Sequence, residues 1–119
     1  MLTLRTLIAS LLMLALMSSY GPGAMAEEAI SEEDMAISYY LPLAESGEPY
    51  AQLTLGEIYY EGRGVKQNLV EAFAWLAVAI RQGAVEAQPL FDHVKKKLSP
   101  QQLKKAEALA GEYLNRYGS

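Results

Sequence analysis

Apolar residues recur along this chain three and four positions apart, a spacing that places them on one face of an α-helix. The pattern predicts helices over residues 31–47, 48–60, 69–82, 84–98 and 100–117, and no stretch alternates in the manner of a β-strand. In the first helix, Met35, Ala36, Tyr39, Leu43 and Ala44 form an apolar stripe that we expect to face the core. The sequence therefore predicts an all-α protein.

Glycine and capping residues mark the ends of the central helices. Gly62 and Gly64 are expected to end the second helix, because glycine adopts the left-handed backbone conformation that is common at helix exits. Asn68 is expected to cap the third helix, and Glu71 occupies the capping-box position three residues later. The central unit is therefore helix, glycine hinge, helix.

Prolines and a second capping pattern affect the remaining helices. Pro42 lies inside the first helix and is expected to kink it or to open one hydrogen bond. Pro89 is expected to make the fourth helix, residues 84–98, irregular. Ser99 and Gln102 have the spacing of a capping box, so the last helix is expected to begin there.

The chain contains an internal repeat with a period of 36 residues. The shift places Ala36 on Ala72, Tyr39 on Trp75, Gly47 on Gly83, Ala51 on Ala87 and Gln52 on Gln88. A period in this range is typical of a helical solenoid. We therefore predict a short α-solenoid of antiparallel helix pairs. It has one helix of a partial repeat at 31–47, a full repeat at 48–83, and a degenerate repeat with a C-terminal capping helix at 84–119.

Residues 1–26 have the layout of a secretory signal peptide. Arg5 precedes an apolar run from Leu7 to Met17, and a small-x-small pattern ends at Ala26. We expect cleavage near Ala26, which gives a secreted or periplasmic domain over residues 27–119 that has no contact with a membrane. A retained anchor is the alternative, but the apolar run is shorter than the roughly 20 residues that span a bilayer.

Charge and cysteine content limit the partners. The chain has 10 Lys and Arg against 14 Asp and Glu, a formal net charge of −4, and no cysteine. An acidic chain is not suited to nucleic acid, and a chain without cysteine forms no disulfide in an oxidising compartment. Acids are concentrated between residues 27 and 48 and lysines between 95 and 105. We interpret them as solvated helix faces, and a dipolar surface that steers a partner or pairs head to tail is the alternative.

Several positions together resemble a known repeat family. The residues are Ala51, Gln52, Leu55, Gly56, Tyr59, Gly62, Gly64, Val65, Ala72, Trp75, Ala79, Gly83 and Ala87. Their pattern is similar to the Sel-one-like repeat, a relative of the tetratricopeptide repeat, and the similarity extends over residues 35–87. It departs in the second copy, where Asp92 takes the place of Gly56. The resemblance implies an interaction scaffold, often in bacterial envelopes, with no activity of its own.

Five residues are the candidate partner contacts: Tyr40, Tyr50, Gln52, Tyr60 and Arg63. Neighbouring side chains on a helix point about 100° apart, so both rings of an adjacent tyrosine pair cannot be buried in a thin domain. A ring with a polar tip suits an interface. The alternative is that the tyrosines only pack on neighbouring helices. Tyr59 and Trp75 are expected in the core.

Catalytic and metal sites find no support in the residue pattern. The only histidine is His93, and the chain has no cysteine, so the three or four ligands of a usual zinc site are missing. Glu57 and Glu61 stand one helical turn apart, where two carboxylates could act as acid and base. On an exposed helix face they are expected to be solvated. We predict no catalytic residue, no metal and no cofactor.

The sequence favours a protein-binding role. We expect an adaptor that binds a segment of another protein on the concave face of the solenoid. Because the chain has fewer than the three repeats that such stacks usually need, self-association or docking on a larger partner is expected to cover its ends. Two alternatives stay open. They are a small structural or stress-related envelope protein without a cleft, and an envelope hydrolase acting through Glu57, Glu61 or His93.

Overall fold

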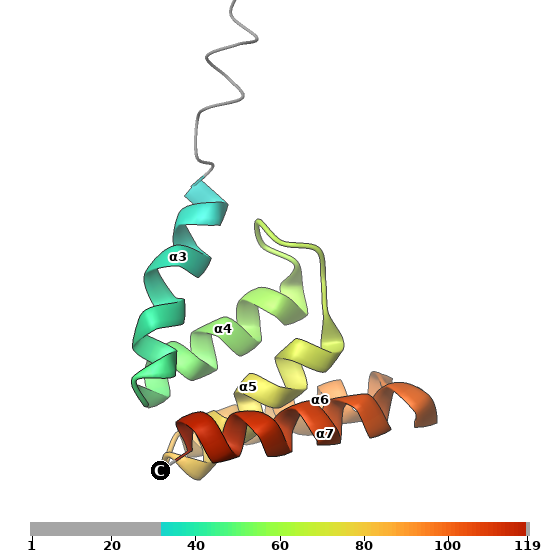
Figure 1. Ribbon diagram of the computed structural model, residues 1–119. Coiled ribbons are helices and arrows are strands. Elements are labelled where there is room, and N and C mark those ends of the chain that lie inside the picture. Colours follow the sequence, from blue (N-terminus) through green and yellow to red (C-terminus); the bar gives the residue numbers. More distant parts are fainter. Residues whose placement is uncertain (1–31, 119) are drawn as a thin grey trace, which may run out of the picture. The chain divides into compact units, whose positions relative to one another are not determined.

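The computed structural model describes residues 32–118, with side chains from Met35 onward (Figure 1). The predicted signal peptide, residues 1–26, and its cleavage near Ala26 lie outside this range. Residues 32–118 form α3 (Glu32–Glu45), α4 (Pro49–Glu61), α5 (Leu69–Arg81), α6 (Gln88–Lys97) and α7 (Pro100–Tyr117), with a 3-10 turn, η1 (Val85–Ala87). These elements include no strand, so the predicted all-α architecture of five helices is confirmed.

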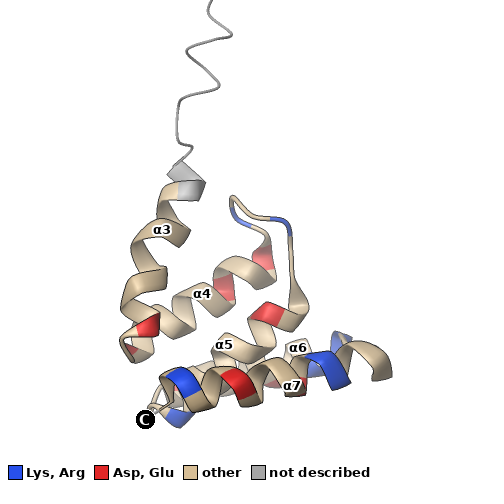
Figure 2. Ribbon diagram, in the orientation of Figure 1, with Lys and Arg blue, Asp and Glu red and all other residues tan. Residues whose placement is uncertain are grey.

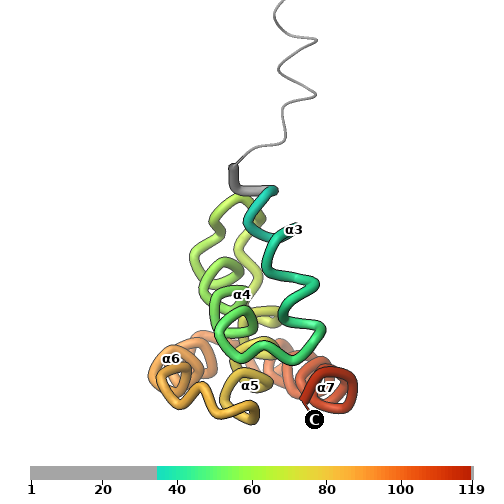
Figure 3. The backbone as a smooth tube through the Cα atoms, turned by 90° about the vertical axis from the view of Figure 1, so that its left-hand side faces the viewer, coloured from blue at the N-terminus to red at the C-terminus, as the bar shows by residue number. Residues whose placement is uncertain are grey.

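Helix α5 is the centre of the packing. It contacts α4, α6 and α7, whereas α3 packs mainly on α4 (Figure 1). Viewed from the side, α5 lies between α6 and α7 (Figure 3). Its buried residues cover most of its circumference: Ala72, Phe73, Ala74, Trp75, Leu76, Val78 and Ala79. A helix that is apolar nearly all round is stable only when neighbours cover it, which explains why three helices surround α5.

The two helices of the full repeat approach most closely at Gly56. A Cβ atom on Gly56 would lie 2.6 Å from the Leu76 side chain and 3.5 Å from the carbonyl oxygen of Ala72. A side chain at this position would therefore push α4 away from α5. The predicted packing role of Gly56 follows from this contact.

The predicted helix ends agree with the structure in most details. Gly62 ends α4 with a φ of 70°, in the left-handed region, and the Asn68 side chain accepts a hydrogen bond from the Glu71 backbone N–H. Ser99 and Gln102 form a complete capping box at the start of α7. Glu71 differs from the expectation, because its carboxylate accepts a hydrogen bond from the Tyr113 hydroxyl at 2.9 Å and not from the cap.

The fourth helix is shorter than the sequence predicted. Residues 85–87 form the 3-10 turn η1, and α6 begins only at Gln88. Pro89 therefore lies in the first turn of α6, where its missing N–H removes no intrahelical hydrogen bond. Pro89 was expected to distort a longer helix, but it lies instead where α6 begins. Pro42, by contrast, lies inside α3, which continues to Glu45.

The C-terminal helix α7 packs on α5 and contacts residues of α4 and of the segment after α5 through Tyr117. The rings of Tyr113 and Tyr117 lie 4.7 and 5.5 Å from the Trp75 ring, which is 2% exposed. The Gln82 side chain donates a hydrogen bond to the Tyr117 carbonyl oxygen at 2.7 Å, and the Gln52 side chain donates to the same oxygen at 3.4 Å. These contacts place α7 as the expected cap and confirm Trp75 as a core residue.

Substitution of two glycines tests the close contact between α4 and α5. We expect Gly56→Ala to lower the free energy of unfolding by about 1–3 kcal/mol, because the added methyl group overpacks against Leu76. The matched control is Gly111→Ala on α7, where an added Cβ meets nothing within 4 Å. That change is expected to raise stability by about 0.5–1 kcal/mol through helix propensity. Urea unfolding of both variants gives the comparison, and a stabilised Gly56→Ala protein would contradict the packing role.

Candidate functional site

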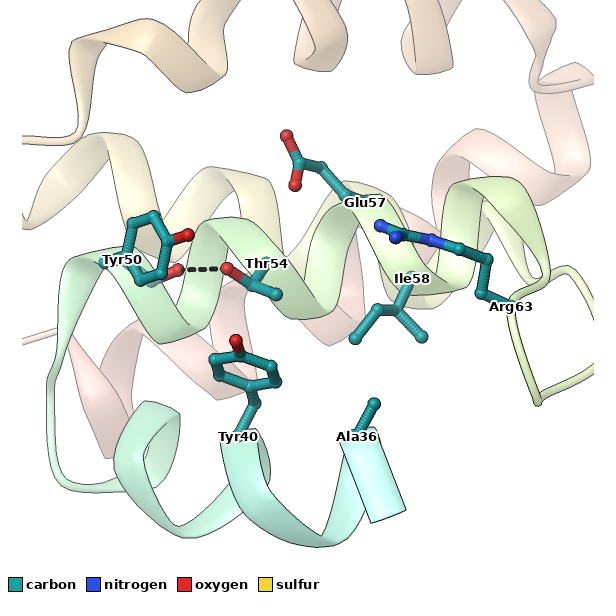
Figure 4. A pocket seen from close by; sticks show the side chains of 7 residues that line it. All are labelled: Ala36, Tyr40, Tyr50, Thr54, Glu57, Ile58 and Arg63. Carbon is teal, nitrogen blue, oxygen red and sulfur yellow. Dashed lines mark hydrogen bonds between the residues drawn. The ribbon is translucent and has the colours of Figure 1, made fainter. Parts of the chain in front are cut away.

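A pocket of about 400 Å³ opens between α3 and α4 (Figure 4). We call it the α3/α4 pocket. It is lined by Ala36 and Tyr40 of α3, by Tyr50, Thr54, Glu57 and Ile58 of α4, and by Arg63 of the following loop. Ala36 and Tyr40 point from α3 toward α4, and Arg63 extends back from the loop (Figure 4). The pocket combines aromatic rings, an apolar floor and two opposite charges.

Each wall of the pocket is held by local packing. Tyr40 is half-buried, and its ring meets the Tyr39 ring edge to face at 5.1 Å. Ile58 is buried and forms the floor, whereas Tyr50 remains 66% exposed at the first turn of α4. The Thr54 hydroxyl donates to the Tyr50 backbone carbonyl at 2.8 Å (Figure 4). The pocket wall therefore combines a packed ring, Tyr40, with an exposed one, Tyr50.

The electrostatics of the pocket centre on Glu57. Burial raises the pKa of the Glu57 carboxyl above its ordinary value, the neighbouring Glu61 carboxylate raises it further, and Arg63 lowers it. Arg63 forms its ion pair with Glu61, at 2.7 Å between Nε and Oε2. Arg63, whose charge lowers the pKa of Glu57, is thus paired with a different carboxylate.

The candidate partner contacts do not form one surface. Tyr40, Tyr50 and Arg63 line the α3/α4 pocket, but Tyr60 turns toward α6. The Tyr60 hydroxyl lies 2.8 Å from His93 Nε2, and the Lys97 ammonium lies 5.5 Å from the centre of its ring. Tyr60 is therefore half-buried by its own neighbours on α6.

Gln52 requires a correction. Its side chain is fully buried, at 0% exposure, so it cannot contact a partner as predicted. The amide nitrogen donates to the Ala44 carbonyl oxygen at 2.9 Å and lies 3.4 Å from that of Tyr117. Gln52 is a structural residue that joins α3, α4 and α7, because the return of α7 covers a face that the sequence pattern leaves open.

The apolar stripe of α3 also differs from the prediction. Met35, Tyr39 and Leu43 were expected in the core, but they are 55%, 66% and 38% exposed. The residues of α3 that pack on its neighbours are Ile37, Tyr40, Leu41 and Ala44. The helix is apolar on both sides, so periodicity alone does not indicate which side is covered. Residues 35–44 contain no charged residue on either side, so the sequence carries no signal that identifies the exposed side.

Charged residues are distributed unevenly over the described helices. Lys95, Lys96 and Lys97 end α6, and Lys104 and Lys105 lie in the first half of α7. Figure 2 shows this basic group at the far side of the unit from α3, while acidic residues lie along α4 and near the end of α3. The α3/α4 pocket lies away from this lysine group and contains one acid, Glu57, and one base, Arg63.

The described residues offer no assembled chemical site of another kind. Between residues 35 and 118, no three His, Asp or Glu side chains gather closely enough to hold a metal ion. Glu57 and His93, two residues considered for hydrolysis, lie on different sides of α4, toward α3 and toward α6. No helix in residues 32–118 is both long and apolar enough to cross a lipid bilayer.

Comparison with known proteins identifies the family. The sequence model of the Sel1 repeat matches residues 8–48 and 49–83. This chain belongs to the Sel1 repeat family. The resemblance expected from the glycine and alanine positions is confirmed, and the second matched repeat contains the close pair α4 and α5. Sel1 repeat proteins generally mediate protein–protein interactions.

Two longer proteins are similar to this Sel1 repeat chain. The alginate biosynthesis protein AlgK of Azotobacter vinelandii is 31% identical over 84 residues, which are 70% of this chain and 18% of AlgK. The crystal structure of c5321, a protective antigen of uropathogenic Escherichia coli strains with an SLR fold, matches with a TM-score of 0.69 and 36% identity. That match covers 74% of this chain and 19% of the c5321 chain. The chain thus spans under a fifth of the length of each relative.

The raised pKa of Glu57 predicts a pH dependence of stability. When the pKa of a carboxyl is higher in the folded state than in the unfolded state, the protein becomes less stable as the pH rises from the unfolded pKa to the folded pKa. The pKa of Glu57 is raised in this way. We therefore expect Glu57→Gln to unfold at a higher temperature than the original protein at pH 7. The difference should disappear below about pH 4, under the ordinary pKa of a glutamate. Thermal unfolding followed by circular dichroism across this range tests the prediction, and an equal effect at both pH values would contradict it.

Proposed function

We propose that this Sel1 repeat protein is a secreted or periplasmic adaptor that binds a segment of another protein in the α3/α4 pocket. The observation that supports this most directly is the convergence of Tyr40, Tyr50 and Arg63 on one pocket. They are three of the five partner contacts that the sequence predicts, and the other two, Gln52 and Tyr60, lie outside the pocket. Tyrosine and arginine are enriched among the residues that contribute most to the affinity of protein interfaces.

The chemistry of the pocket fits a peptide segment better than a small substrate. The pocket is open to solvent along α3, and Tyr39 and Tyr50 extend its apolar surface outward. Glu57 and Arg63 provide opposite charges at one end (Figure 4). Exposed apolar surface with a polar border is typical of an interaction site on a soluble protein.

Two observations support the proposed location outside the cytoplasm. The pattern of residues 1–26 is that of a secretory signal peptide. The chain is also similar to an alginate biosynthesis protein and to a protective antigen of a bacterial pathogen. We propose a role in the cell envelope on these grounds. No catalytic step is part of the proposal, because Glu61 pairs with Arg63 and His93 contacts Tyr60 on another side of α4.

Affinity capture from a periplasmic extract tests the adaptor role. We expect Tyr50→Ala to weaken capture of the partner about tenfold or more, the loss that removal of a central interface ring commonly causes. Val85→Ala is the matched control, because Val85 is an equally exposed apolar residue (74%) on η1, outside the pocket. Loss of capture with both variants, or with neither, would contradict a binding role of the pocket. Recovery of no specific protein would favour a structural envelope protein.

A further inference from the structure

The internal repeat shows what kind of element fits the α3/α4 pocket. The 36-residue shift makes Ala36 and Tyr40 of α3 equivalent to Ala72 and Leu76 of α5. These two residues of α5 are the ones that Gly56 of α4 contacts, with 2.6 Å from an added Cβ to Leu76 and 3.5 Å to the Ala72 carbonyl oxygen. On α3 the equivalent residues line an open pocket. Both residues are only partly buried, and α4 covers Tyr40 on one side through the cluster that contains Ala51 and Leu55.

A second equivalence leads to the same conclusion. Tyr39 is equivalent to Trp75 by the same shift. Trp75 is 2% exposed because Leu55, Tyr113 and Tyr117 cover it, whereas Tyr39 is 66% exposed. Within the part of the chain that the structure describes, the α3 position equivalent to Trp75 therefore lacks the cover that Trp75 has on α5.

We propose that the occupant of the α3/α4 pocket is an α-helix of the partner protein, which lies on α3 as α4 lies on α5. This inference rests on the proposed function and specifies the partner. The helix carries a small residue, glycine or alanine, where it crosses Ala36 and Tyr40, because Gly56 is required at the equivalent crossing. Its apolar face covers the exposed side chains of Met35, Tyr39 and Leu43, which follow one another at four-residue intervals on α3.

The acidic residues around α3 indicate which charge the partner helix carries beside its apolar face. Residues 35–44 contain no charged residue, but acids stand at both ends of this segment and inside the pocket: Glu32, Glu33, Asp34, Glu45, Glu48 and Glu57. Lysine or arginine on both sides of the apolar face of the partner helix complements these acids. Two copies of this chain paired antiparallel through α3 would bring acids against acids, and an anionic lipid surface would meet the same repulsion. The charges therefore favour a different protein with basic flanks.

The test uses a synthetic helical peptide as the probe. Its sequence is that of α4, Pro49–Glu61, with Glu57→Lys and Glu61→Lys and with two lysines added before Pro49, so that it has the packing surface of a first helix and basic residues at both ends. Fluorescence anisotropy with the full mature protein, residues 27–119, measures its affinity. We expect binding, and we expect Gly56→Leu in the peptide to weaken it about tenfold or more by overpacking at the crossing. The peptide with both glutamates retained should bind more weakly, and added salt should reduce the difference.

Variants of the protein locate the binding surface. Ala36→Leu and Tyr50→Ala should each weaken binding of the basic peptide, while Val85→Ala should leave it unchanged. Circular dichroism of each variant verifies that it is folded, and Tyr50 is exposed enough that its replacement cannot disturb the core. Equal binding of the glycine and leucine peptides, or no binding of either, would overturn a helical occupant. If capture of a protein partner still depended on Tyr50 in that case, the adaptor role would stand without the helix. If light scattering showed that the original protein is a dimer and that the Ala36→Leu variant is a monomer, the surface would instead bind a second copy of the chain.

Discussion

The close approach of α4 to α5 at Gly56 is the contact on which the remaining structure depends. Leu76 occupies the space that a side chain at position 56 would need, at 2.6 Å from an added Cβ. With α4 in this position, Leu55 reaches Trp75, and α7 can cover Trp75 from the other direction with Tyr113 and Tyr117. Because α5 is apolar on nearly all sides, none of its neighbours can be lost without exposing a large apolar area.

Local sequence signals predict the elements of this fold well. Gly62, Asn68 and Ser99 each determine a helix end through their own backbone or side-chain chemistry, and neighbouring residues suffice to identify them. Repeat spacing predicts the packing role of Gly56, which is a contact inside the α4–α5 pair, and the burial of Trp75, which also depends on α7. The start of α6 was misplaced because Pro89 fits a first turn as well as an interruption.

The site was only partly predictable because exposure depends on contacts distant in sequence. Periodicity shows that Met35 and Tyr39 share a face of α3, but not that this face lacks a covering helix. Gln52 is polar and lies in a first helix, yet α7, more than 45 residues later, encloses it. Tyr60 was grouped with Tyr50, although the two rings point to different neighbours, α6 and the α3/α4 pocket. Within residues 35–118, the two ends of the repeat therefore differ: α7 covers one, whereas side chains of α3 are exposed at the other.

We propose on the basis of this asymmetry that α3 carries the recognition surface, and amide hydrogen exchange tests that proposal most directly. In the free protein, amides of α5 should exchange slowest and those of α3 fastest among the helices, because α3 has one main neighbour and α5 has three. On binding the captured partner, exchange should slow in α3 and in the half of α4 that lines the α3/α4 pocket, with α6 and α7 unchanged. Slower exchange around Tyr60 and His93, with α3 unaffected, would contradict the account.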